Sequence, residues 1–213
     1  MTHVRNKSTV AQVSRDSVPL ESVSPRLVFE AARRAEAMGL VEPGAMVRSD
    51  VAAVRHLANR VRRAGIASAA ADELNNVAAP TAAEVAELLE TMVAALEASP
   101  VPKFEWAGLG RVFPAEDLAS LLHISASSLK RYQQGERATP DSTAARLHFL
   151  ALVVGDLAGS YNDVGIRRWF HRKRTMLDNR TPAAILAGEW DPDDDGPMRL
   201  RALARSLTTL TAT

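Results

Sequence analysis

The sequence contains no cysteine, few aromatic residues and no apolar run long enough to cross a lipid bilayer. The lack of cysteine excludes disulfides, thiolate nucleophiles and cysteine-ligated zinc, and it is typical of a reducing compartment. The five histidines do not have the spacing of metal ligands, and there is no phosphate-binding loop or nucleophile elbow. We therefore expect a cytoplasmic protein that makes no membrane contact, is not an enzyme, and needs neither metal nor cofactor.

Alanine is abundant among the 213 residues and β-branched runs are scarce, which predicts an all-α fold. The net charge is only +1, but it is unevenly distributed along the chain. Residues 1–70 carry 11 basic and 6 acidic side chains, residues 125–188 carry 10 and 5, and residues 71–124 carry 2 and 9. Two basic zones separated by an acidic one fit a protein with one surface for a polyanion and another for a protein partner.

Helix and turn signals divide the chain into four parts. Thr81 and Glu84 form the capping-box pair of a long helix, whose apolar stripe either dimerises the protein or packs within its own domain. A proline-bounded stretch over 99–110 predicts a linker that carries Phe104 and Trp106. The expected organisation is a disordered arm (1–23), an N-terminal helical module (24–100), a helix-turn-helix region (110–160) and a small helical C-terminal domain (161–213).

Residues 115–134 have the pattern of two short helices joined by a tight turn. Ser125 is expected to cap the second helix, and His123 stands at a turn position where glycine is usual. The apolar spacing predicts an inner stripe made of Leu118, Ala119, Leu122, Ile124, Leu129 and Tyr132.

The second of these helices has a polar and basic outer face, as a recognition helix needs in the major groove of DNA. Side chains of these types bond phosphate oxygens and base edges. The predicted DNA-contacting residues are Ser127, Ser128, Lys130, Arg131, Gln133 and Gln134. The alternative is an ordinary helical hairpin with a solvated face.

Residues 165–186 crowd arginines and a lysine around Trp169 and Phe170. Such a segment can bind nucleic acid by gripping phosphates beside a stacking aromatic ring. Alternatively, the aromatic side chains anchor a small helical subdomain while the cations remain solvated. The sequence leaves both readings open, and it does not decide whether this segment contacts DNA or a protein.

A long apolar helix is expected after the hairpin, within ATPDSTAARLHFLALVVGDL, and a set of spaced residues follows it. These residues are Trp169, Arg174, Leu177, Thr181, Pro182, Leu186, Gly188, Trp190, Asp191 and Pro192. In this order and after such a helix, they resemble the Xre/MbcA/ParS type of antitoxin over residues 113–213. In that family a small helix-turn-helix region precedes a helical toxin-binding domain.

The resemblance implies a protein partner, a RES-type toxin that consumes NAD and is held inactive by the C-terminal domain. It places the interface in residues 165–213, with the end of the chain reaching the active-site cleft of the toxin. The residues that it assigns to toxin binding are Trp169, Arg174, Trp190, Leu207, Leu210 and Thr213.

The leading hypothesis is therefore a type II antitoxin that neutralises its toxin by direct binding and represses its own transcription. Repressors of this kind bind double-stranded operator DNA as symmetric oligomers, so we expect a homo-oligomer. The alternative is a stand-alone helix-turn-helix transcriptional regulator without a toxin partner, whose N-terminal helices dimerise it or sense a signal. A nucleic-acid-processing enzyme would need carboxylates or histidines in one cleft, which their spacing does not indicate.

Overall fold

The computed structural model describes residues 25–44 and 50–210, with side chains as far as residue 207. The regular elements in this part of the chain are helices, and Arg174 and Arg180 form an isolated bridge. The prediction of an all-α fold is confirmed. The arm expected over 1–23 and the candidate residue Thr213 lie outside the described residues.

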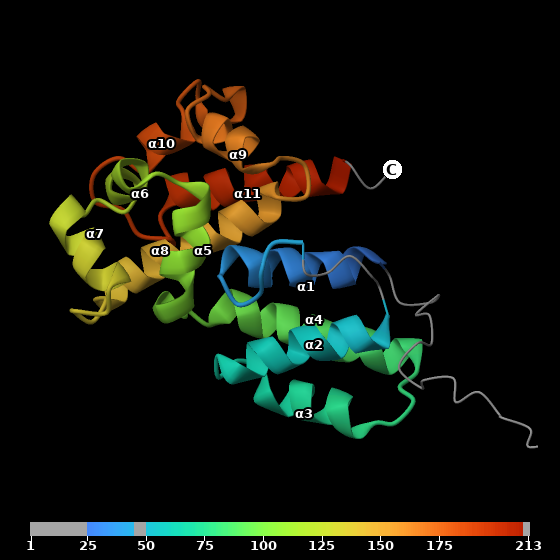
Figure 1. Cartoon of the computed structure of the whole chain (residues 1–213). Helices are drawn as coiled ribbons and strands as arrows, with labels where there is room; N and C mark the ends of the chain where they lie inside the picture. The colour runs from blue at the N-terminus through green and yellow to red at the C-terminus, as the bar shows by residue number, and fades with distance from the viewer. Residues whose placement is uncertain (1–24, 45–49, 211–213) are drawn as a thin grey trace, which may run out of the picture.

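The helices follow one another through short connections (Figure 1). In chain order they are α1 (Pro25–Ala37), α2 (Val51–Arg63), α3 (Ser68–Asn76), α4 (Ala82–Ala98), α5 (Pro102–Val112), α6 (Ala115–Leu121), α7 (Ala126–Gln133), α8 (Asp141–Leu157), α9 (Asp163–Phe170), the 3-10 turn η2 (Thr175–Leu177), α10 (Pro182–Ile185) and α11 (Asp195–Leu210).

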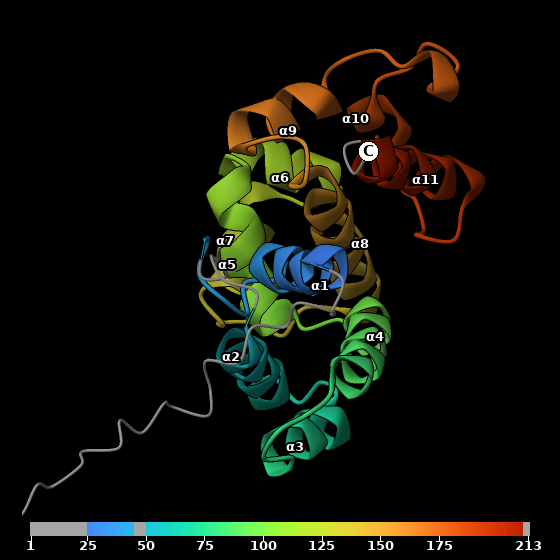
Figure 2. The ribbon, with the colours of Figure 1, turned by 90° about the vertical axis from the view of Figure 1, so that its right-hand side faces the viewer.

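Helix α8 is the centre of the core. Every residue from Leu147 to Leu157 is buried, as its apolar sequence predicts. Helices α1, α5 and α11 pack against it, and α1 also packs against α4 (Figure 2). One continuous hydrophobic core joins Val28 of α1 to Ala204 of α11. The helices of the predicted N-terminal module therefore share their core with the C-terminal half.

The stretch predicted to be a linker is the helix α5. Pro102 lies at its first position, where a backbone amide makes no hydrogen bond within the helix, so the lack of an N–H in proline costs nothing. Trp106, Leu109 and Val112 are buried at helical spacing. The prediction of a linker is wrong because proline is also favoured at the first position of a helix, which Pro102 occupies. As a result, α4 and α8 are joined through packed helices instead of a flexible connection.

Helices α2, α3 and α4 lie together on the side of α1 opposite α11 (Figure 1). The predicted capping box at the start of α4 is confirmed, since Thr81 Oγ1 accepts from the Glu84 amide at 3.3 Å and Glu84 accepts from the Thr81 amide at 2.7 Å. The apolar stripe of α4 packs against α1 and α3. Of the two alternatives, the stripe thus packs within the chain's own core.

The backbones of α1 and α5 meet at two glycines. A Cβ placed on Gly108 would lie 2.3 Å from the Ala37 carbonyl oxygen, and one placed on Gly39 would lie 2.3 Å from the Phe104 carbonyl oxygen. Gly39 also has φ +73°, a left-handed conformation that suits the end of α1. This contact fixes α5, which in turn supports α7.

None of the described helices combines the length and the apolarity that crossing a bilayer would require.

Candidate functional site

The candidate site is the outer face of α7 in the α6–α7 hairpin. The turn between the two helices closes with the Ile124 amide donating to the Ala119 carbonyl at 3.0 Å. His123 has φ +52°, so the residue that replaces the usual glycine adopts the left-handed conformation itself. Ser125 caps α7 as predicted, and its Oγ accepts from the Ser128 amide at 3.1 Å.

The inner face of α7 is held on α5. Leu129 and Tyr132 are buried, and the Tyr132 ring stacks on Trp106 with ring centroids 5.9 Å apart. The Trp106 indole in turn donates to Thr139 Oγ1 at 3.0 Å, in the loop that follows α7. The predicted inner stripe is buried throughout except for Ile124, which is half-buried. Helix α7 therefore presents a fixed outer face.

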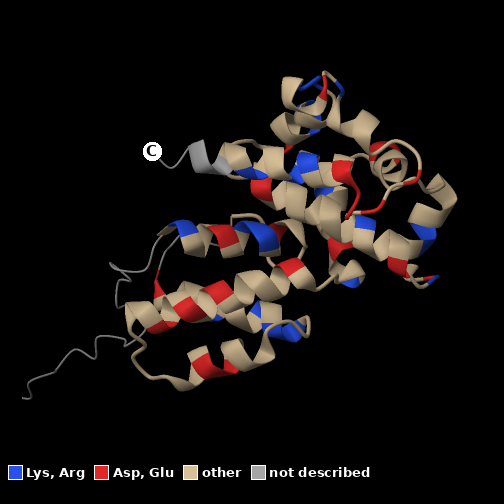
Figure 3. Cartoon of the chain, turned by 180° about the vertical axis from the view of Figure 1, so that it is seen from behind, with Lys and Arg blue, Asp and Glu red and all other residues tan. Residues whose placement is uncertain are grey.

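The structure brings all six predicted DNA-contacting residues together on α7 and its C-terminal cap. Ser127, Lys130, Arg131, Gln133 and Gln134 are exposed, and neither Lys130 nor Arg131 makes a salt bridge within the described part of the chain. Figure 3 shows these basic segments at the end of the molecule, away from the acidic segments of α4.

Two of the six differ from the sequence expectation. Ser128 is half-buried, and its hydroxyl accepts from Ser125 Oγ at 3.0 Å, so it belongs to the cap of the helix. Gln133 lies on the flank that faces α5, since its Nε2 is 3.6 Å from where a Cβ on Gly110 would be. The outermost side chains are those of Ser127, Lys130, Arg131 and Gln134.

The tryptophans assigned to toxin binding are core residues. Trp169 is 1% exposed and packs edge-on against Phe170, and Trp190 is 5% exposed with its indole donating to the Leu121 carbonyl at 3.0 Å. Their assignment as contact residues is wrong, because buried rings have no surface to offer a partner. The spacing of residues along the sequence does not separate core positions from interface positions.

Two of the remaining residues of that set, Arg174 and Leu207, are half-buried. Arg174 is half-buried, with its guanidinium 5.2 Å from the centre of the Trp169 ring. Leu207 is half-buried against the core. Leu210 ends α11, and its side chain, like Thr213, is outside the described part.

Some arginines of the segment 165–186 bond to the backbone of other residues, and others are exposed to solvent. Arg167 donates to the Val112 carbonyl at 2.7 Å, and Arg180 donates to the Ala184 carbonyl at 2.6 Å. Arg168, Arg172 and Lys173 are exposed. Of the two readings left open by the sequence, the anchoring of a subdomain by Trp169 and Phe170 agrees with their burial, and the exposed cations remain available for a partner.

Two exposed methionines near this segment have no counterpart in the sequence prediction. Met176 is 71% exposed and Met198 is 52% exposed. Arg199 links α11 to η2 and the residue after it, since it donates to the Met176 carbonyl at 3.1 Å and to Asp178 Oδ2 at 3.0 Å. No periodic pattern in the sequence distinguishes these two methionines from core residues. They are recognised as surface residues only from their exposure in the structure.

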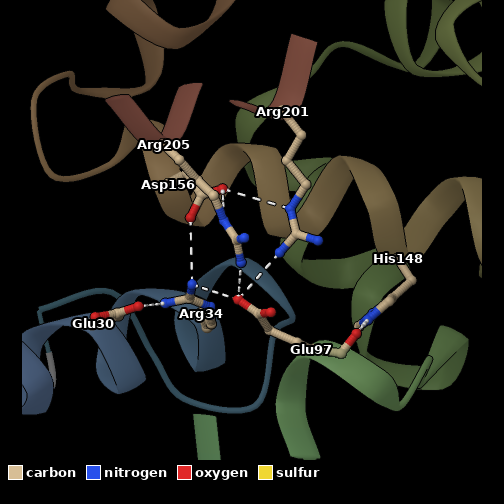
Figure 4. Close-up of polar contacts among 7 residues, drawn as sticks. All are labelled: Glu30, Arg34, Glu97, His148, Asp156, Arg201 and Arg205. Atoms are coloured by element: carbon tan, nitrogen blue, oxygen red, sulfur yellow. Dashed lines mark hydrogen bonds and ion pairs between the residues drawn. The ribbon is translucent and has the colours of Figure 1, made fainter. Parts of the chain in front are cut away.

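A cluster of charges joins α1, α4, α8 and α11 (Figure 4). Arg34 is 4% exposed, and its guanidinium lies 2.8 Å from Glu30, 2.7 Å from Glu97 and 3.6 Å from Asp156. Arg201 and Arg205 of α11 pair with the same two carboxylates on α4 and α8. The cluster fixes α11 to the N-terminal helices.

Burial and pairing act in opposite directions on the carboxylates of this cluster. Burial raises the pKa of Asp156, and the charge of Arg34 only partly offsets it. Burial would raise the pKa of Glu97 as well, but hydrogen bonds from Arg205 and Arg34 outweigh it and lower that pKa. Glu97 is therefore an ionised partner for three arginines.

Glu105 and His148 form a separate buried pair between α5 and α8. His148 Nδ1 lies 2.6 Å from Glu105 Oε1, and His148 Nε2 lies 3.0 Å from the Glu97 carbonyl oxygen. Burial raises the pKa of Glu105, against the opposing effect of His148. No group of three or more histidine, aspartate or glutamate side chains in residues 25–44 and 50–207 is arranged to hold a metal ion.

Comparison with protein-family models, with curated proteins and with solved structures finds no match to this chain.

Proposed function

We propose that this chain is a DNA-binding antitoxin. Its α6–α7 hairpin is a helix-turn-helix that places α7 in the major groove of operator DNA, and residues 161–213 bind a RES-type toxin. Two copies bind the two half-sites of a palindromic operator. The antitoxin part of the proposal rests on the family resemblance of residues 113–213.

The observation that carries the DNA-binding part is the contrast between the two faces of α7. Leu129 and Tyr132 fix the inner face to α5, whereas Lys130 and Arg131 project from the outer face without a salt bridge to the described residues. Cations without a carboxylate partner on a fixed helix are suited to phosphates and base edges.

Arg131→Ala is expected to weaken binding to a duplex that the wild-type chain selects from a random DNA library. Loss of one phosphate contact should reduce affinity roughly fivefold to tenfold at 0.1 M salt and lower the slope of log affinity against log salt by about 0.9. Fluorescence anisotropy at several salt concentrations measures both quantities. Failure of the wild-type chain to enrich any duplex, or an unchanged titration with Arg131→Ala, contradicts the proposal.

The surface best suited to the toxin surrounds the two exposed methionines. Methionine and arginine are both enriched at protein interfaces, and the flexible methionine side chain adapts to the surface of a partner. Met176 and Met198 flank Arg199, and Arg172 and Lys173 are exposed in the segment that precedes η2. All of these residues lie in the region that the resemblance assigns to the partner.

Met176→Glu is expected to abolish co-purification with a RES-type enzyme encoded beside this chain, because it brings a charge into an apolar contact. DNA affinity should be unchanged. Arg131→Ala is the reciprocal control, which should keep the toxin and weaken DNA binding. Point substitutions are preferable to truncation, since removal of residues 190–213 would take Trp190, Leu200 and Ala204 out of the core. Intact DNA binding by a chain that captures no such enzyme would support a stand-alone regulator instead.

A further inference from the structure

A hollow lies between the start of α5 and the end of α7. It has a volume of about 520 Å³, and the loop after α7 closes one side of it. Its lining includes Lys103, Trp106, Tyr132, Gln134, Arg137 and Thr139.

The charged side chains that line this hollow are both cations. Lys103 and Arg137 are exposed, and neither makes a salt bridge within the described residues. Glu136 is next to Arg137 in sequence but is not part of the lining. The hollow therefore presents two positive charges without a carboxylate among its walls.

The wall between these cations is rigid. The stacked rings of Trp106 and Tyr132 form it, and the Trp106 indole is bonded to Thr139 in the loop. The Arg137 guanidinium lies 5.9 Å from the centre of the Tyr132 ring, which positions it at the edge of the hollow. Both cations are thus attached to elements that already hold α7 in place.

We infer that this hollow holds a backbone phosphate of the DNA strand that passes the C-terminal end of α7; the inference rests on the proposed DNA binding by α7. Gln133 and Gln134 belong both to the predicted DNA-contacting set and to the lining of the hollow. A duplex on α7 therefore brings its backbone to Lys103 and Arg137. Lysine and arginine are the side chains that neutralise DNA phosphates, and such contacts fix register without reading sequence.

The inference extends the DNA interface from the hairpin to α5. Lys103 lies before the helix-turn-helix region in sequence, in the stretch that sequence reasoning interprets as a linker. Its proximity to the end of α7 follows only from the packing of Trp106 on Tyr132. Helix α5 then both supports α7 and contacts the backbone of a DNA strand.

The test is the salt dependence of duplex binding by the full chain carrying Lys103→Ala or Arg137→Ala. Each substitution should lower the slope of log affinity against log salt by about 0.9 and weaken binding roughly fivefold to tenfold at 0.1 M salt. The preference for the selected duplex over a scrambled one should be unchanged. Arg26→Ala removes an exposed cation in the first turn of α1, a helix that lies apart from α7 (Figure 1). It is matched in charge and should alter neither quantity.

The outcomes separate the two proposals. If Arg131→Ala weakens binding while Lys103→Ala and Arg137→Ala leave the slope unchanged, the phosphate site is wrong and DNA binding by α7 stands. If Lys103→Ala or Arg137→Ala changes the preference between the two duplexes, the hollow contacts bases and the inference is overturned. If the wild-type chain binds no duplex, both proposals fail.

Discussion

Gly108→Ala is expected to lower the free energy of unfolding by about 3 kcal/mol, the upper part of the range for overpacking. The added Cβ would lie 2.3 Å from the Ala37 carbonyl oxygen and 2.7 Å from the Gly39 amide nitrogen. Both are backbone atoms, so no side-chain rotation can relieve the overlap, and α1 and α5 must move apart. Denaturant unfolding followed by circular dichroism measures the change.

Gly110→Ala is the matched control, since it adds the same atom to the same helix. Its Cβ would meet only Gln133 Nε2, at 3.6 Å, which is an ordinary van der Waals contact. Alanine is also favoured over glycine within a helix by about 1 kcal/mol, so this variant should be as stable as the wild type or more so. Equal losses of stability in the two variants would show that the α1–α5 contact is not as close as described.

Arg34→Met is expected to cost about 3–5 kcal/mol of unfolding free energy, because it removes one partner of a buried ionic cluster. Methionine retains the unbranched aliphatic part of the side chain but carries no charge, so Glu97 and Asp156 remain close together with only Arg201 and Arg205 to balance them. Asp156 is the more affected, since its side chain is 6% exposed. Thermal and denaturant unfolding both report the loss.

Arg62→Ala is the control for this prediction. It breaks the pair between Arg62 and Asp72 at 2.9 Å, in which both side chains are 51% exposed. Exposed pairs contribute about 0–1 kcal/mol, so this variant should unfold almost as the wild type does. A loss at Arg34 no larger than the loss at Arg62 would mean that the cluster does not hold α11 to the N-terminal helices.

The local features of the fold are predictable from the sequence. The cap of α7 by Ser125 and the capping box of Thr81 and Glu84 depend on residues within one turn of each other, and both are confirmed. The buried stripe of α6 and α7 follows from helical spacing, because a helix of fixed period determines which residues share a face. The same reasoning predicts which side chains α7 exposes.

The long-range features are not predictable in this way. Arg205 and Glu97 are 108 residues apart in sequence, and nothing local indicates that α11 returns to α4. In the sequence, each charged residue of this cluster looks like an ordinary solvent-exposed residue of its own helix. For the same reason the sequence does not indicate that Lys103 lies beside α7. The two are brought together by the packing of α5 against α7.

Trp169 and Trp190 show a different limit. The family resemblance predicts that both contact a partner, but a tryptophan is equally suited to a core and to an interface. In the structure Trp169 packs edge-on against Phe170, and the Trp190 indole donates to the Leu121 carbonyl of α6. Exposure has to be known before an interface can be assigned, and it moves the candidate surface to Met176 and Met198.

The most direct test of the account uses the lack of cysteine in the sequence, which leaves a single introduced thiol as the only site for labelling. Ser127→Cys, labelled with an iron chelate that generates hydroxyl radicals, places the cleaving reagent on the outer face of α7. The account predicts strand cleavage at discrete positions in each half-site of the selected duplex, and none from Arg26→Cys labelled in the same way. Bound duplex left intact by the label at position 127, or cut equally by the label at position 26, would contradict it.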